Sequence, residues 1–108
     1  MPQKKVLMIT KVNVKWELLE KFNEYWRRES LPNWIEHGAK HIGSFENYLG
    51  ATKNQIVRLW EFDDFSKWEK FMEWRNKGMY ESEQPQKVHT DIRGFVENIE
   101  ETIWFSVY

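Results

Sequence analysis

The sequence predicts one α+β domain whose four-stranded antiparallel sheet carries two helices on one face and meets a second copy of the chain with the other. The first observation is the length: 108 residues fit a single domain, which we place over residues 1–108, and cannot hold two. The second is the order of periodic segments along the chain: strand, helix, strand, strand, helix, strand. The third is a surplus of apolar surface, because aromatic residues make up 17% of the chain and the strands are apolar on both faces.

The first strand and the first helix come from the N-terminal third of the chain. Residues Lys5 to Val12 contain a run of four apolar residues, which indicates a strand covered on two sides. Asn13 is a suitable helix N-cap, and from Lys15 onward apolar residues recur every three or four positions, as in an amphipathic helix. This apolar stripe comprises Trp16, Leu18, Leu19, Phe22, Tyr25 and Trp26. Pro32 should end or bend the helix, and one further helical turn should stop at Gly38.

Two strands and a second helix follow. Residues 42–49 and 55–62 have strand patterning, and residues 50–54 between them contain the Gly and Asn of a short antiparallel hairpin loop. The segment Ser66-Lys-Trp-Glu69 matches a capping box and predicts the start of the second helix. Gly78 is the expected stop of that helix.

The C-terminal region is less regular. Met79 to Thr90 contains Pro85 and is compatible with helical turns on either side of it, whereas Ile99 to Tyr108 predicts the last strand. The complete order of elements is the split-βαβ arrangement of ferredoxin-like domains, in which helices cover only one face of the sheet. Since large apolar residues such as Ile56 and Val57 alternate onto both faces, another chain should cover the second face.

The composition excludes several functional classes. The formal net charge is −1 and basic and acidic residues alternate, so the chain lacks the basic surface that nucleic-acid binding requires. The absence of cysteine excludes disulfides, thiolate catalysis and Cys-ligated zinc or iron–sulfur clusters. No apolar run approaches the roughly 20 residues of a membrane span, and the N-terminus lacks the apolar segment of a signal peptide. We therefore expect a cytoplasmic protein.

A set of motifs runs from about Val12 to Phe71. These motifs are the Trp-rich first helix, Leu31-Pro32, His37-Gly38, Gly43-Ser-Phe45, Leu49-Gly50, Asn54, Val57-Arg-Leu-Trp-Glu-Phe62 and Phe65-x-x-Trp68. The spacing of the proline, the glycines and the Leu-Trp strand resembles the NIPSNAP family within the dimeric α/β-barrel superfamily. The final third of the chain matches this pattern only loosely.

The resemblance implies a fold and a range of activities. In such proteins two ferredoxin-like sheets close face to face into one barrel, which would supply the second copy that the strands require. The superfamily includes cofactor-independent quinone-forming monooxygenases, haem-degrading monooxygenases, haem-binding chlorite dismutases and members without a known activity. Kinship of fold does not select among these activities, and we assign no cofactor from the sequence.

Arg58 is the residue of the predicted strands that most needs a partner. Its neighbours Val57 and Leu59 should be buried, and a buried guanidinium has to be compensated. Glu46 on the adjacent strand and Glu101 on the last strand are the expected partners, in a salt bridge inside the barrel or at the dimer interface. The alternative is that Arg58 orients a ligand in a pocket.

The three histidines suggest two kinds of site. His37 and His41 have the H-x₃-H spacing that can hold a metal on a continuous helix, with His89 as a third ligand. Gly38 should end the helix between the first two, so we expect separate loop histidines and no metal site. The resemblance also implies a haem alternative, because His89 lies where haem-degrading members carry their ligand and Phe65-x-x-Trp68 resembles their aromatic residue. The first strand lacks the asparagine that those enzymes place there.

The aromatic residues would either fill the core or line an apolar cavity between helices and sheet. Such a cavity should measure roughly 300 Å³ or more and contain a few converging polar groups. The aromatic candidates for its wall are Tyr48, Trp26, Trp60, Trp68 and Trp104. Trp74 lies off the apolar stripe of its helix and is expected at a subunit contact.

We therefore predict a homodimeric small-molecule-binding barrel, with a cofactor-independent monooxygenase-like reaction on an apolar or aromatic substrate as its activity. The candidate ligand-binding residues are His37, His41, Tyr48, Arg58, Trp60, Trp68 and His89. The alternatives are a non-catalytic dimeric interaction or regulatory module and a haem-binding or haem-degrading protein.

Overall fold

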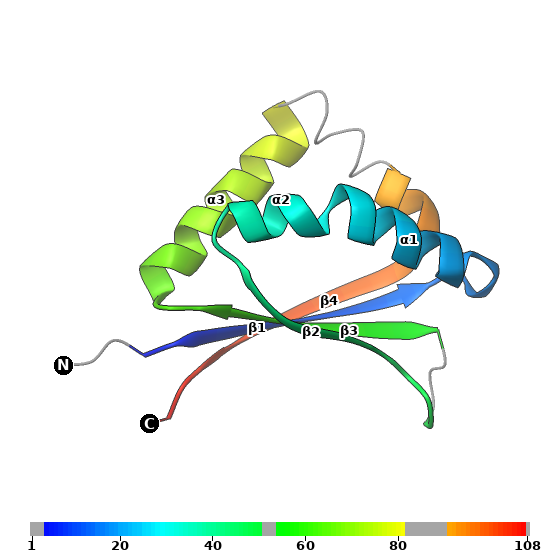
Figure 1. Cartoon of the computed structure of the whole chain (residues 1–108), viewed down its shortest axis with the longest axis horizontal. Helices are drawn as coiled ribbons and strands as arrows, with labels where there is room; N and C mark the ends of the chain where they lie inside the picture. Colours follow the sequence, from blue (N-terminus) through cyan, green and yellow to red (C-terminus); the bar gives the residue numbers. More distant parts are fainter. Residues whose placement is uncertain (1–3, 51–53, 82–90, 108) are drawn as a thin grey trace.

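A computed structural model describes residues 4–50, 54–81 and 91–107 of the chain, and shows a sheet with helices packed on one side (Figure 1). The elements are β1 (Val6–Val14), the 3₁₀ helix η1 (Trp16–Leu18), α1 (Leu19–Glu29), α2 (Leu31–Glu36), β2 (Lys40–Glu46), β3 (Gln55–Phe62), α3 (Phe65–Glu81) and β4 (Val96–Phe105). Residues 91–95 are also helical. This is the α+β, ferredoxin-like architecture that the order of periodic segments predicts.

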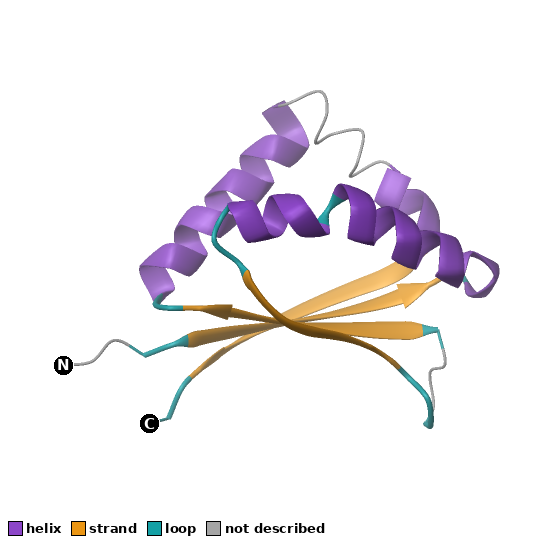
Figure 2. Ribbon diagram, in the orientation of Figure 1, coloured by secondary structure: helices purple, strands orange, loops and turns teal. Residues whose placement is uncertain are grey.

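The four strands form one antiparallel sheet in the order β2-β3-β1-β4. All of the labelled helices lie over the same face of this sheet (Figure 2). The connection from β1 through α1 and α2 passes over β3 to the edge strand β2, and the connection from β3 through α3 returns over β1 to the other edge strand β4. The two central strands are therefore the ones that the helices cover most completely.

The core lies between the helices and the central strands. Cross-strand partners share a face, so the pairs Met8↔Trp60 and Val12↔Ile56 both point toward the helices. The buried apolar residues are Val6, Met8, Val12, Val14, Phe22, Trp26, Ala39, Ile56, Trp60, Phe62 and Phe71. Burial in β3 alternates strictly between buried and half-buried, which is the period-2 signal that predicted this strand with its correct bounds.

The first helical region agrees with the prediction in its middle and differs at its start. Pro32 does separate α1 from α2, where it occupies the first turn, and Gly38 ends α2 with a φ of +103°. Asn13 is not a helix N-cap: it lies in β1, where its Oδ1 accepts a hydrogen bond from Gln55 Nε2. Pairing of β1 with both of its neighbours continues to this point, and Val14 beyond it is fully buried, so the sheet prevails over the local capping preference.

The start and the stop predicted for the second helix are both wrong. The residue that caps α3 is Asp64, whose Oδ1 accepts a hydrogen bond from the backbone N–H of Lys67 at 2.9 Å, whereas Ser66 lies inside the helix. The helix also continues past Gly78 to Glu81. A glycine inside a helix costs only about 1 kcal/mol, which the contacts of the preceding turns can offset.

Strand bounds shift by a few residues where the edges of the sheet are formed. The strand predicted over residues 42–49 is β2, Lys40–Glu46, and the strand predicted over residues 99–108 is β4, which begins at Val96 and ends at Phe105. The centre of the predicted hairpin loop, residues 51–53, lies outside the described residues. The same holds for residues 82–90, which contain Pro85, and for Tyr108.

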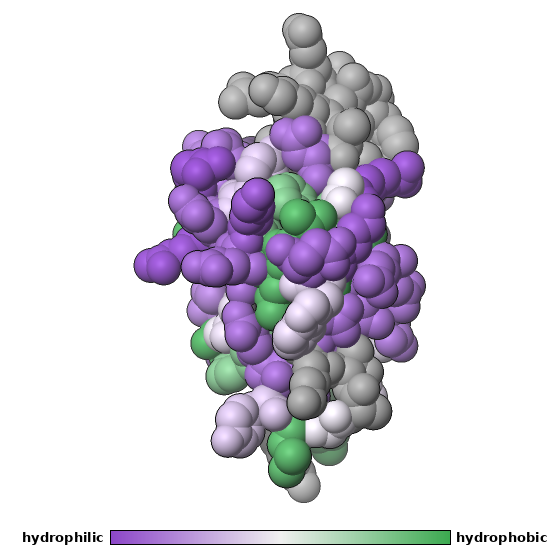
Figure 3. Space-filling view, turned by 90° about the vertical axis from the view of Figure 1, so that its right-hand side faces the viewer, coloured by the Kyte–Doolittle hydropathy of each residue, from purple (hydrophilic) through white to green (hydrophobic). Residues whose placement is uncertain are grey.

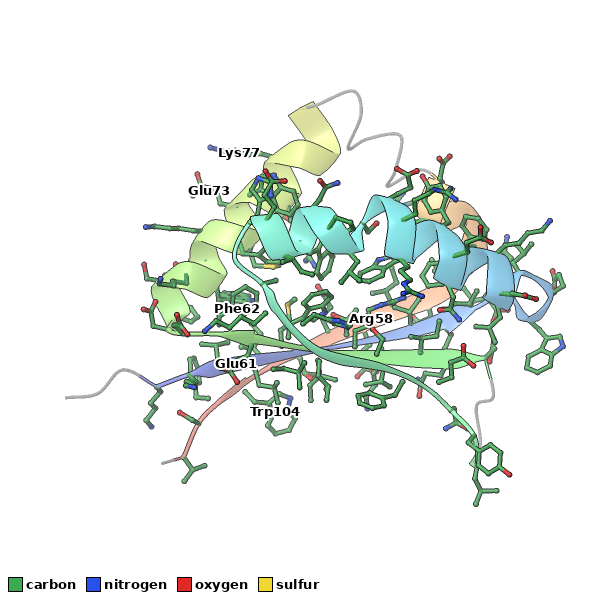
Figure 4. All side chains as sticks on the ribbon, viewed as in Figure 1. Arg58, Glu61, Phe62, Glu73, Lys77 and Trp104 are labelled. Atoms are coloured by element: carbon green, nitrogen blue, oxygen red, sulfur yellow. The ribbon has the colours of Figure 1, made fainter. Side chains whose placement is uncertain are left out.

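The side of the sheet away from the helices has no cover within the described part of the chain. We call it the open face, and its apolar residues include Leu7, Ile9, Phe45, Val57, Leu59 and Trp104. Figure 4 shows Trp104 pointing away from the helices, while Phe62 and Arg58 point toward them. A space-filling view, turned by 90°, shows apolar surface near the bottom of the molecule (Figure 3). Leu49, in the β2–β3 connection, is highly exposed.

Within the residues that the structure describes, no helix is long and apolar enough to cross a membrane.

Candidate functional site

A pocket of about 470 Å³ lies between α1, the start of α2 and the neighbouring strands β2 and β3. We call it the β2-edge pocket. Its lining residues are Asn23, Trp26, Arg27, Leu31, His41, Ser44, Phe45, Glu46, Ile56 and Arg58. The pocket thus combines apolar walls with a small number of polar side chains, which is the usual composition of a small-molecule site.

Arg58 is the most unusual of these residues. It stands in the middle of β3, opposite Thr10 on one side and Ser44 on the other, and all three side chains face the helices. Only 3% of its surface is exposed. Its Cζ lies 3.6 Å from the centre of the Trp26 ring, a close cation–π contact. Burial lowers the pKa of Arg58 to about 10, so the guanidinium remains charged at neutral pH.

The salt bridges predicted for Arg58 do not form. Glu46 accepts a hydrogen bond from Asn23 Nδ2 at 2.6 Å, which links β2 to α1. Glu101 binds Arg75 through two hydrogen bonds, of 2.7 and 2.8 Å, and accepts a third from Thr10 Oγ1. Among the described residues, no hydrogen bond or ion pair reaches Arg58, and its Nε is enclosed without a partner.

His41 and Ser44 form the strand side of the pocket. The Nε2 of His41 lies 2.8 Å from Ser44 Oγ, and its ring packs against Trp60 with ring centres 4.9 Å apart. Burial and the positive charge of Arg58 lower the pKa of His41. Its ordinary value is about 6.5, so the imidazole is neutral at pH 7.

A β-bulge brings His41 and Ser44 together. Residues three apart in a regular strand point to opposite faces. In β2 the register shifts between His41 and Gly43, so that Ile42 is an extra residue, and both His41 and Ser44 face the helices. Gly43 fits this turn of the strand closely, because a Cβ there would lie 2.8 Å from two ring atoms of Phe45. The bulge therefore shapes one wall of the pocket.

Of the residues predicted as ligand contacts, His41 and Arg58 lie together in the β2-edge pocket. Trp60 is fully buried beneath His41 and does not line the pocket. Tyr48 is 94% exposed in the β2–β3 connection. Trp68 is half-buried on α3, where its ring packs against Phe65. A role in ligand binding stays a prediction for each of these five residues.

The two other predicted residues are the histidines His37 and His89. His37 follows α2 and stacks on Trp74, with ring centres 3.8 Å apart and an angle of 9° between the planes. Trp74 therefore packs within its own chain, and the subunit contact that the sequence predicts for it stays a prediction. Gly38 separates His37 from His41, and no group of three metal-binding side chains occurs among the described residues. His89 lies outside those residues.

The sequence did not identify Asn23 and Ser44 as parts of the pocket. Asn23 lies on α1 three residues before Trp26 and so near the same face of the helix, but it is polar and falls outside the apolar stripe from which the sequence predicts contacts. Ser44 is small and lies next to the bulge, and its facing direction depends on a register that the hydrophobic pattern does not encode. The signal that could have identified Ser44 is the pairing of β2 with β3, because it places Ser44 opposite Arg58 on the same face of the sheet.

A comparison with family models gives one match: the model described as NIPSNAP covers residues 12–106. A search of curated proteins found no match. The matched range includes the whole of the β2-edge pocket and every strand from the end of β1 onward.

Solved structures share the fold at low sequence identity. An uncharacterised NIPSNAP domain protein from Burkholderia xenovorans is 18% identical over 94% of each chain, with a TM-score of 0.78. A dimeric ferredoxin-like protein from an uncultured marine organism is 14% identical over 99% of this chain and 91% of its own, with a TM-score of 0.73. A protein from Nitrosomonas europaea, named as a candidate antibiotic biosynthesis monooxygenase, is 13% identical over 95% of this chain and 99% of its own, with a TM-score of 0.67.

Proposed function

The chain belongs to the NIPSNAP family, and on that basis we propose that it is a homodimeric small-molecule-binding protein whose ligand occupies the β2-edge pocket. The observation that carries this proposal is the pocket itself. Its volume of about 470 Å³ exceeds the roughly 300 Å³ that small-molecule sites need, and its walls include Trp26, Leu31 and Ile56. These apolar side chains suit an apolar or aromatic ligand, and we place the pocket within a single domain over residues 1–108.

The reaction that we propose for this pocket is oxygenation of an aromatic substrate without a cofactor. The Nitrosomonas europaea protein, named as a candidate monooxygenase, supports the proposal through a shared fold only. The chemical support comes from His41, a neutral imidazole at pH 7 that can accept the proton of a phenol. The resulting phenolate is electron-rich and can be oxidised by O₂. With 1-naphthol the products would be 1,4-naphthoquinone and water, which account for both oxygen atoms of O₂.

We expect 1-naphthol to bind saturably and to be oxidised with one O₂ consumed per molecule. Ser44→Phe places a ring in the pocket and should weaken binding by about tenfold or more, which corresponds to about 1.4 kcal/mol. Ser66→Phe adds the same ring at an exposed position of α3 outside the pocket and should leave binding unchanged. Tryptophan fluorescence measures the binding, and an oxygen electrode measures the reaction.

The outcomes of this experiment separate the two functional classes. Saturable binding without oxygen uptake would exclude the enzyme and favour the non-catalytic module. Failure of 1-naphthol to bind, or equal binding by the Ser44→Phe variant, would contradict the assignment of the ligand to the β2-edge pocket.

We also propose that the homodimer forms through the open face, as two ferredoxin-like sheets do when they close into a barrel. Leu59→Asp puts a charge at the centre of this face, between Ile9 and Gly43 of the neighbouring strands. Desolvating an unpaired carboxylate is costly, so we expect the variant to be monomeric where the unmodified chain is dimeric. Light scattering at micromolar concentration measures the mass of the particle in solution.

Ile35→Asp on α2 is the matched control, because Ile35 is exposed on the helix side and its substitution should not affect the dimer. A monomeric unmodified chain would contradict the proposal.

A further inference from the structure

Among the residues that the structure describes, Arg58 is a buried cation without an anionic partner. Its side chain is buried between β3 and α1, with the Trp26 ring 3.6 Å and the Phe22 ring 5.4 Å from its Cζ. In the described part of the chain it has neither an ion pair nor a hydrogen bond. Buried charges in proteins are nearly always paired, because an unpaired one loses its hydration without compensation.

The carboxylates that could neutralise Arg58 are held elsewhere. Glu101 lies across Thr10 on β4, where Arg75 takes both of its oxygens. Glu46 is bound to Asn23 at the rim of the pocket. The fold therefore keeps both acids in other contacts while it retains the guanidinium at the pocket wall, so neither of them compensates its charge. An anionic ligand in the pocket would do so.

The cation–π contact with the Trp26 ring occupies one side of the Arg58 guanidinium. A guanidinium that lies over an aromatic ring contacts the ring with its flat face, and its N–H groups point outward in its own plane. A carboxylate is also planar and can accept two parallel N–H···O bonds along that edge. Leu31 and Ile56 line the same pocket and offer apolar surface beside the charged group.

The charged residues that line the pocket favour an anionic ligand. Arg58 and Arg27 are cationic, Glu46 is anionic, and His41 is neutral at pH 7, so two positive groups stand against one negative group. Arg27 is exposed on α1, so it attracts anions only through solvent, whereas Arg58 acts in surroundings from which water is largely excluded.

We infer that the ligand of the β2-edge pocket is an aromatic or apolar carboxylic acid, whose carboxylate binds Arg58 while its hydrocarbon part contacts Trp26, Leu31 and Ile56. This inference rests on the proposed function, since it names the class of ligand for the same pocket. In this role Arg58 makes the pocket bind carboxylic acids more tightly than neutral molecules of the same shape.

The test compares 1-naphthoate with 1-naphthamide, which has nearly the same shape and no charge, by isothermal titration calorimetry at pH 7. We expect the acid to bind at least ten times more tightly than the amide. Arg58→Met should remove this preference, and Arg58→Lys, which keeps the charge without the planar fork, should reduce it. Circular dichroism checks that each variant is folded. If Arg58→Met does not fold, the preference for the acid is measured on Arg58→Lys alone.

Two matched variants separate a direct contact from general electrostatic attraction. Arg27→Met removes an exposed cation of the same pocket and should leave the preference for the acid largely intact. Glu46→Gln removes the negative charge at the rim and should tighten binding of the acid. An equal loss of preference in Arg27→Met and Arg58→Met would overturn the role given to Arg58.

The results also distinguish this inference from the proposed function. If 1-naphthamide and 1-naphthoate bind equally and Arg58→Met changes neither affinity, the inference is wrong while the pocket remains a binding site for neutral molecules. If neither compound binds at millimolar concentration and 1-naphthol does not bind either, both the inference and the proposed function are wrong.

Discussion

Trp60→Ala is expected to lower the free energy of unfolding by about 3–5 kcal/mol, the usual cost of removing a large aromatic side chain from a core. Trp60 has no exposed surface, and it lies where α1, α2 and the sheet meet. Its ring contacts Trp26 at 5.8 Å and Trp34 at 4.8 Å between ring centres. Trp26 of α1, Trp34 of α2 and His41 of β2 would lose a shared neighbour, so the cavity could not close by the movement of one side chain. Urea denaturation followed by far-UV circular dichroism measures the effect.

Trp16→Ala is the control for this prediction, because Trp16 is 63% exposed in η1 and should change stability by no more than about 0.5 kcal/mol. Trp60→Phe keeps most of the ring and removes an indole N–H that has no partner among the described residues, so its cost should be much smaller. Similar losses for Trp16→Ala and Trp60→Ala would show that Trp60 does not hold the helices on the sheet.

Glu101→Gln is expected to cost about 2–3 kcal/mol at pH 7, because it leaves Arg75 without a counter-charge in a half-buried position. Burial raises the pKa of Glu101, but the hydrogen bonds and charge of Arg75, together with the Thr10 hydroxyl, outweigh burial and hold the pKa below its ordinary value. These bonds join α3 to β4 and β1, so the carboxylate fixes the position of the helix over the edge of the sheet.

The pH dependence of the same variant follows from the sign of that shift. A carboxylate with a lowered pKa stabilises the folded state above its unfolded pKa of about 4.3 and loses this contribution as the pH falls through the folded value. The difference in free energy of unfolding between the unmodified chain and Glu101→Gln should therefore be largest at pH 7 and decrease below about pH 4. Urea denaturation at pH 7 and at pH 3 measures this difference. Glu73→Gln is the control, since Glu73 projects from α3 away from the sheet and pairs with Lys77 in solvent (Figure 4). A difference that persists unchanged at pH 3 would contradict the role of the ionised carboxylate.

The architecture was predictable because the hydrophobic periods of the strands and of α1 are strong and their order admits few topologies. The ends of the elements were less predictable, because they depend on contacts made elsewhere. Asn13 has the chemistry of a cap, yet it continues a strand since both neighbouring strands extend to it. Ser66 and Glu69 match a capping box, yet Asp64 caps the helix two residues earlier.

The sequence identified two residues of the β2-edge pocket as ligand contacts, His41 and Arg58, and it identified Arg58 for a physical reason. A charged residue in the middle of an apolar strand identifies Arg58 from the sequence, because burial of a charge needs a reason. Its partners were mispredicted because pairing depends on strand order: β1 lies between β3 and β4, so Thr10 separates Arg58 from Glu101. Arg75, from a helix distant in sequence, is then nearer to Glu101, and no local pattern predicts that contact.

The extra residue in β2 has a consequence for how this chain can change over time. Loss of one codon in a surface connection usually shortens a loop and leaves the strands in register. Loss of the codon for Ile42 would restore regular alternation in β2, and His41 and Ser44, then two residues apart, would still point to the same side of the sheet. β2 can therefore lose the extra residue, and with it the bulge, while His41 and Ser44 both stay on the side of the sheet that faces the pocket.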